Sequence, residues 1–162
     1  MNHSTTYPST RTLLDWRHHE LEELFSTLTP GDLPSGNLRG TLFGIAGLQR
    51  LPRILNRIVL ILLSTPINPW RGKSFNAGHG SNLWLFLRGP RFGHYRIGAN
   101  IGPDGGQSHW LDYNVDSNIA PLKPIRGEAR QLASGQWLCR MLWQGKKGAG
   151  TLLWFTLSKA NA

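Results

Sequence analysis

IRGEARQLASGQWLCRMLWQGKKGAGTLLWFTLS, residues 125–158, carries the pattern that is most informative about the fold. It contains segments of strand length at 125–132, 136–143 and 151–158, the last two of them mostly apolar. The connections between these segments are short and rich in glycine, and connections of this kind join antiparallel strands into hairpins. The stretch therefore predicts three sequential antiparallel strands.

The same pattern of strands and tight turns extends toward the N-terminus. Breaks at Gly89-Pro90 and in the glycine-rich sequence 102–106 separate the apolar segments. Further strands are predicted at 83–88, 93–100, 107–114, near 38–43 and within 70–76. The expected fold is mainly β, either an antiparallel lipocalin-like (calycin-type) barrel or a strongly curled sheet.

Two segments have helical periodicity. Apolar residues recur at helical spacing over 12–28, where Thr12 and Asp15 form a capping-box pattern and Pro30 follows the last turn. A second helix is expected at 52–64, because Pro52 suits a first helical turn. We therefore expect a flexible leader at 1–10 and a single barrel domain at 11–162 that carries both helices.

Composition narrows the class of protein. The chain has 162 residues and a single cysteine, Cys139, which excludes an intramolecular disulfide framework and which we expect to be a buried, inert thiol. The N-terminal segment lacks a basic-then-apolar signal pattern, and the longest apolar run is too short to cross a membrane. These features predict a soluble, cytoplasmic protein of bacterial type.

The chain is strongly basic. Eighteen lysines and arginines against nine acidic residues give a formal charge of +9. Nucleic acid, an anionic membrane surface and an acidic small molecule would each suit this charge. The basic residues are scattered along the sequence, so nucleic acid is the least expected of these partners. A helix with Arg50, Arg53 and Arg57 on one face would suit an anionic membrane.

Two short motifs give the chain a resemblance to a known family. Gly36-Asn37-Leu38-Arg39-Gly40 has the form G-x-L-x-G, and Trp70-Arg71-Gly72-Lys73-Ser74-Phe75 follows it. The pair resembles the GXWXG-type bacterial domain family, whose members combine G-x-W-x-G with a later W-x-G-K-x-F. Leu38 stands where that family has tryptophan. The family has no settled activity, so the resemblance implies a small closed barrel, similar to lipocalins in strand order, and no particular reaction.

One predicted strand concentrates charge on one of its faces. Alternation over 125–132 places Arg126, Glu128 and Arg130 together, and Arg140 of the next strand could join them across the hairpin. If this face points into the barrel, the arginines would hold an anionic head group. If it points outward, the same residues form an exposed ladder of ion pairs. A shift of one residue separates the two arrangements, and the sequence leaves both open.

A second candidate segment is the polar and aromatic sequence 109–116. His109 shares one strand face with Tyr113, and Asp112 shares the opposite face with Trp110 and Asn114. His109 and Tyr113 would form a proton-transfer pair, and Asp112 would be a base. Turn and cap chemistry at the end of a strand is the alternative explanation for Asp112.

The chain has seven tryptophans, and most of them fall in predicted strands. Aromatic rings at this density either fill a barrel or line an apolar pocket. The strand at 136–143 is apolar on both faces, so its outer face needs a cover, either the N-terminal helices or the second chain of a homodimer. No metal-binding or nucleotide-binding motif occurs in the sequence, so we expect neither a metal site nor a cofactor.

Together these patterns predict that the protein binds a hydrophobic or aromatic small molecule with an acidic group in an aromatic-lined cavity. Proton-transfer catalysis of the isomerase, cyclase or lyase type is an extension, and a module that binds anionic membranes or nucleic acid is the alternative. The residues expected to bind the ligand are Arg126, Arg130, Arg140, Tyr113, Trp110 and Trp84. The residues expected to transfer protons are Asp112, His109 and Glu128.

Overall fold

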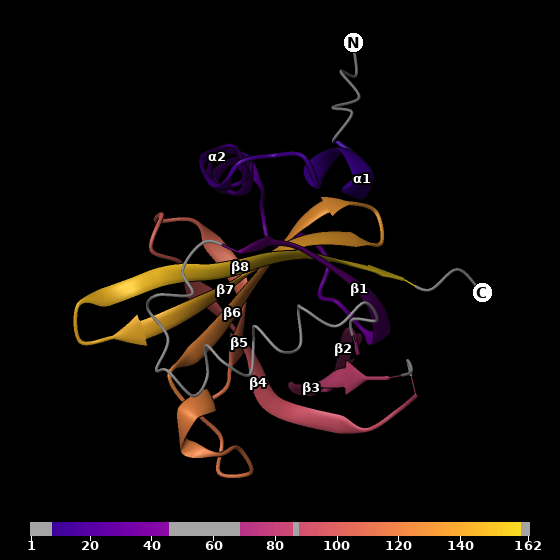
Figure 1. Ribbon diagram of the computed structural model, residues 1–162, viewed down its shortest axis with the longest axis vertical. Coiled ribbons are helices and arrows are strands. Elements are labelled where there is room, and N and C mark those ends of the chain that lie inside the picture. Colours follow the sequence, from indigo (N-terminus) through magenta and orange to yellow (C-terminus); the bar gives the residue numbers. More distant parts are fainter. Residues whose placement is uncertain (1–7, 46–68, 86–87, 160–162) are drawn as a thin grey trace.

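The computed structural model describes residues 8–45, 69–85 and 88–159, and these form a closed barrel of eight antiparallel strands (Figure 1). Each strand pairs with its neighbours in sequence, and the last strand pairs back with the first. The predicted antiparallel barrel is therefore confirmed. The strands are β1 (Gly36–Ile45), β2 (Trp70–Asn76), β3 (His79–Trp84), β4 (Arg91–Ile101), β5 (Gln107–Asp112), β6 (Ile125–Ala133), β7 (Gln136–Gly145) and β8 (Gly148–Lys159).

The structure divides the helix expected at 12–28 into two, α1 (Thr10–Leu13) and α2 (His18–Thr27). The hydroxyl of Ser9 caps α1 by accepting a hydrogen bond from the Thr12 N–H, so Thr12 lies inside the helix and does not begin it. Helix α2 begins after Arg17, whose N–H donates to the Glu20 carboxylate at 2.6 Å.

Other helical segments are short or lie outside the described residues. A 3-10 turn, η2 (Ala120–Leu122), lies between β5 and β6. The helix expected at 52–64 and most of the leader expected at 1–10 fall outside the described residues. None of the helices in the described ranges has the length and apolar character needed to span a membrane.

The strand expected at 83–88 lies earlier in the chain, as β3. Leu85 has a φ of +64°, a left-handed conformation that strand residues do not adopt. Its N–H donates to the Pro69 carbonyl at 2.6 Å instead of continuing the ladder. The strand therefore ends at Trp84, which pairs with Trp70 of β2.

Alternate side chains of the strands fill the barrel interior. On β7, Trp137 and Cys139 belong to the interior cluster, and Leu138 between them belongs to a second cluster outside the barrel. The interior cluster is rich in aromatic rings and draws on most of the strands. Its buried members are Leu38, Phe75, Tyr95, Leu111, Tyr113, Ile125, Ala129, Trp137, Cys139, Leu152, Phe155 and Leu157.

Helix α2 covers the outer face of the C-terminal strands (Figure 1). Its residues Leu21 and Phe25 pack against Leu138 of β7 and Trp154 of β8 in the second buried cluster. The rings of Phe25 and Trp154 meet edge to face, with their centroids 5.6 Å apart. The N-terminal helices thus supply the cover that the apolar outer face of β7 requires.

The segment between α2 and β1 closes one end of the barrel. The Asp32 carbonyl accepts a hydrogen bond from the Trp137 indole at 2.9 Å, and the Gly31 carbonyl lies 3.1 Å from Nε2 of His109. Gly31 has a φ of +59°, and a Cβ at this position would lie 1.9 Å from Oε1 of Gln131. Glycine is therefore required for the segment to lie this close to the barrel.

Candidate functional site

Lys73 of β2 lies buried in the barrel interior. Strand alternation places Lys73 on the same inward face as Phe75, a member of the interior cluster. Its side chain is only 1% exposed. Lysine is almost never fully buried without a partner, so this position calls for a chemical explanation.

Two polar side chains hold the amine of Lys73. Nζ donates to Oδ1 of Asn82 at 2.6 Å and to the hydroxyl of Tyr113. The Tyr113 hydroxyl donates in turn to Oδ1 of Asn82 at 3.3 Å, and the indole of Trp70 donates to the same oxygen at 3.3 Å. Asn82 lies directly opposite Lys73 in the ladder between β2 and β3. We refer to Lys73, Asn82 and Tyr113 as the lysine cluster.

Aromatic rings surround the lysine cluster. Nζ of Lys73 lies 4.9 Å from the ring centroid of Tyr95, 5.1 Å from that of Tyr113 and 5.3 Å from that of Phe155. Ring faces at these distances attract a cation but do not neutralise it. Across residues 8–45, 69–85 and 88–159, no carboxylate forms an ion pair with Lys73. The ammonium form therefore has no anionic counterpart in this part of the chain.

This environment changes the acidity of the buried groups. Burial lowers the pKa of Lys73 from 10.5 to about 7, because desolvation destabilises the ammonium, and the neighbouring Cys139 opposes this shift only in part. Burial raises the pKa of the Tyr113 phenol and of the Cys139 thiol, so both keep their protons at neutral pH. The lysine cluster thus combines an amine that titrates near pH 7 with a phenol that stays protonated.

An amine in such a site has two kinds of chemistry. As an ammonium it pairs with an anionic group, and as a neutral amine it accepts a proton or attacks a carbonyl carbon. The described part of the chain contains no group of three or more His, Cys, Asp or Glu side chains that could hold a metal ion. The two groups of the lysine cluster that can exchange a proton are the amine of Lys73 and its phenol neighbour, Tyr113.

The charged face of the strand at 125–132 points out of the barrel, beneath α2. Glu128 and Arg130 are fully buried and Arg140 is 3% exposed. They therefore form neither the interior anion site nor the exposed ladder that the sequence left open. Nε of Arg140 donates to the Glu128 carboxylate at 2.6 Å, which confirms that Arg140 joins this face across the hairpin.

Two further carboxylates complete this outer network. Arg140 also pairs with Glu22 of α2, and Arg130 donates two hydrogen bonds, of 2.7 and 2.8 Å, to Asp104 in the turn between β4 and β5. Both guanidinium groups lie over the ring of Phe25, at 4.2 and 4.5 Å from its centroid. We refer to Glu22, Asp104, Glu128, Arg130 and Arg140 as the arginine network.

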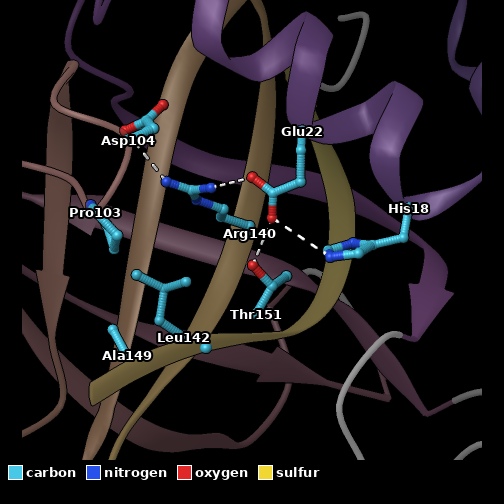
Figure 2. Close-up of a pocket in the computed structure, with 9 residues that line it drawn as sticks. His18, Glu22, Pro103, Asp104, Arg140, Leu142, Ala149 and Thr151 are labelled. Atoms are coloured by element: carbon cyan, nitrogen blue, oxygen red, sulfur yellow. Dashed lines mark hydrogen bonds and ion pairs between the residues drawn. The ribbon is translucent and has the colours of Figure 1, made fainter.

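A cleft of about 320 Å³ opens beside the arginine network (Figure 2). Figure 2 shows Arg140 between Glu22 and Asp104, with Thr151 and His18 beside Glu22. Thr151 donates to Glu22 at 2.7 Å, and Nε2 of His18 lies 3.6 Å from the same carboxylate. The carboxylates of the cleft are thus already paired with groups of the protein, and the network joins α2 to the barrel.

The arginine network lowers the pKa of Asp104. Partial burial by itself raises the pKa of its carboxyl group. The hydrogen bonds from Arg130, the positive charges of Arg130 and Arg140 and the N–H of Gly106 outweigh this effect, so the pKa of Asp104 lies below its usual value of 3.8. The turn that carries Asp104 stays close to the sheet because Gly102 and Gly106 have no Cβ to meet Glu128 and Arg130.

Three other predicted site residues, Asp112, Arg126 and Trp110, lie on the outer surface of the barrel. Asp112 forms ion pairs with Arg96 at 3.3 Å and with Arg126 at 3.1 Å. Its carboxylate also accepts a hydrogen bond from the Asn114 N–H at 2.8 Å, which is the cap chemistry expected as the alternative role for Asp112. Trp110 pairs in register with Glu128 and therefore shares this outer face.

The structure does not bring the three predicted proton-transfer residues together. His109 is bound to the segment that closes the barrel end, Asp112 lies on the opposite face of β5, and Glu128 belongs to the arginine network. Trp84 ends β3 with its indole hydrogen-bonded to the Phe92 carbonyl at 3.2 Å. Among the nine predicted site residues, Tyr113 is the one that belongs to the lysine cluster.

Sequence reasoning did not select Lys73 or Asn82 as site residues. The signal for Lys73 was nevertheless present in the sequence 70–75, where alternation gives Lys73 the same face as the aromatic residue Phe75. A lysine on the apolar face of a strand is unusual and marks a candidate site. No local pattern identified Asn82, because its role depends on pairing between β2 and β3.

Comparison with known proteins supports the fold and no more. No protein-family model matches the chain, and no curated protein matches it either, so the resemblance to the GXWXG-type family stays a prediction. The chain is similar to a crystal structure of a protein from Thermomonospora curvata, with a TM-score of 0.59 and 20% sequence identity. The match covers 90% of this chain and 89% of the other. An eight-stranded barrel with a buried aromatic cluster is compatible with small-molecule binding.

Proposed function

We propose that this protein binds an apolar small molecule that carries an acidic group, and that the ammonium group of Lys73 pairs with that acid inside the barrel. The observation that carries the proposal is a fully buried lysine, surrounded by aromatic rings, for which the described chain supplies no carboxylate. A ligand carboxylate would supply the missing negative charge. Its apolar part would contact the aromatic side chains that surround the amine.

The position of the lysine cluster suits this role. An eight-stranded barrel is wide enough for its own side chains or for one small ligand. One barrel end is closed by the segment before β1, whereas Trp70, Met141 and Trp143 are only partly buried where they pack against the interior cluster. We propose that an apolar molecule reaches Lys73 past these partly buried side chains.

The proposal keeps the ligand class predicted from the sequence and changes the residues that hold it. Lys73, rather than Arg126, Arg130 and Arg140, binds the acidic group, because those arginines lie outside the barrel with carboxylates of their own. Lys73 and Tyr113 are likewise the pair proposed for any proton transfer. Binding to an anionic membrane through Arg50, Arg53 and Arg57 depends on residues outside the described ranges.

The test is a titration with decanoate and with decanol, followed by the fluorescence of the seven tryptophans. Decanoate should bind more tightly than decanol. Because only protonated Lys73 forms the ion pair, and its pKa in the free protein is about 7, decanoate affinity should fall as the pH rises. The expected fall is about tenfold per pH unit between about pH 7.5 and 8.5, while decanol affinity stays constant. Equal affinities with the same pH profile, or no binding of either compound, would overturn the proposal.

A further inference from the structure

We propose that Lys73 also captures apolar aldehydes as a covalent imine, with the Tyr113 hydroxyl as the proton donor. This inference rests on the proposed function, because it uses the same interior site and a ligand with the same kind of apolar chain. It adds a reaction, since an aldehyde has no charge with which to pair and instead reacts with the amine itself.

The geometry of the lysine cluster supports this reaction. Nζ of Lys73 is fixed by Asn82 at 2.6 Å and by the Tyr113 hydroxyl, so the nucleophile and a proton donor are already in contact. The Tyr113 hydroxyl is also anchored by its hydrogen bond to Asn82. The amine is 1% exposed and lies among the rings of Tyr95, Tyr113 and Phe155, so bulk water is excluded from the site.

The electronic state of both groups fits the roles assigned to them. Burial lowers the pKa of Lys73 to about 7, so a large fraction of the amine is neutral and nucleophilic at neutral pH. Burial raises the pKa of Tyr113, so its phenol is present in the protonated form that can donate. The amine of an ordinary surface lysine is almost fully protonated at this pH, so it is a much weaker nucleophile.

The reaction balances without a cofactor. The lone pair of Nζ attacks the aldehyde carbon, a carbon–nitrogen bond forms, and a proton from the nitrogen moves to the former carbonyl oxygen to give a carbinolamine. Tyr113 donates its proton as the carbon–oxygen bond breaks and the hydroxyl leaves as water. The second proton lost by the nitrogen returns to the Tyr113 oxygen. The products are an imine and one water molecule, and nothing is oxidised or reduced.

The test is trapping with decanal and cyanoborohydride at pH 8, followed by peptide mapping of the full chain. Hydride from the reagent adds to the imine carbon, the nitrogen takes up a proton from water, and the product is a stable secondary amine. The exposed lysines Lys146, Lys147 and Lys159 are internal controls. We expect the peptide that contains Lys73 to be modified at least about tenfold faster than the peptides that contain these surface lysines.

Three variants and a parallel titration separate the possible results. K147M should keep the selective adduct, and K73M should lose it. The rate of trapping at saturating decanal should fall in Y113F, because the proton donor is removed. Adducts confined to surface lysines in the wild type, together with tight decanoate binding, would overturn the imine and leave the proposed function intact. The absence of both selective trapping and decanoate binding would overturn the imine and the proposed function together.

Discussion

K73M should weaken the binding of decanoate about 100-fold and change the affinity for decanol less than about threefold, because removal of one partner of a buried charge pair costs about 2–5 kcal/mol of binding free energy. The methionine side chain keeps the apolar part of lysine and removes only the amine. Decanol has no charge to pair with, so it reports the apolar contacts alone. Calorimetric titration of both ligands at pH 7 measures the two effects on one sample.

The effect should be specific to the interior lysine. K147M removes the same charge from an exposed position and should leave both affinities unchanged. K73M should fold, because Asn82 keeps its hydrogen bonds from Tyr113 and Trp70 and the desolvation of the amine no longer opposes folding. Decanoate affinities of K73M and the wild type that agree within a factor of three would show that Lys73 does not pair with the acid.

R140M should lower the free energy of unfolding by about 3–5 kcal/mol, because breaking a buried ion pair leaves an uncompensated charge. Arg140 is the partner of Glu128, whose side chain is fully buried. Without the guanidinium, Glu128 retains, among the described residues, the hydrogen bond from Ser108 at 3.0 Å, and Glu22 of α2 loses its ion pair to the barrel. Urea denaturation at pH 7 measures the loss.

Two controls distinguish this role from a role in binding. R96M removes an arginine whose side chain is 66% exposed, and it should cost less than about 1 kcal/mol. The double variant E128M/R140M should recover part of the stability, because neither charge is then left buried alone. The affinity of folded R140M for decanoate should equal that of the wild type. A loss of affinity with unchanged stability would return Arg140 to the ligand-binding role predicted from the sequence.

The barrel itself could be predicted because its determinants are local. On β7, alternation alone separates Trp137, Cys139 and Met141, which belong to or pack against the interior cluster, from Leu138 of the outer cluster. Glycine-rich turns then set the order of the strands. The boundaries of β3 could not be read in this way, because Leu85 leaves the ladder through its backbone conformation and its hydrogen bond to Pro69.

The direction of each face could not be predicted, because it depends on contacts between distant segments. Charged residues on the outer face of a barrel are usually solvated, whereas Glu128, Arg130 and Arg140 are buried there by α2. Lys73 shows the converse: a lysine in a strand usually points to solvent, and this one points into the core. Only the closed arrangement of the strands places Asn82 and Tyr113 around it.

In the proposed function, Lys73 is a buried amine that becomes protonated when an acidic ligand binds. The most direct test is an NMR titration of protein with isotope-labelled lysine, recorded with and without decanoate. We expect one lysine with a pKa of about 7 in the free protein, absent from K73M, and a rise in that pKa when decanoate binds. The expected rise is about two units, in keeping with an ion pair of about 100-fold effect on affinity. A pKa of Lys73 that stays the same in the presence of decanoate would contradict the claim.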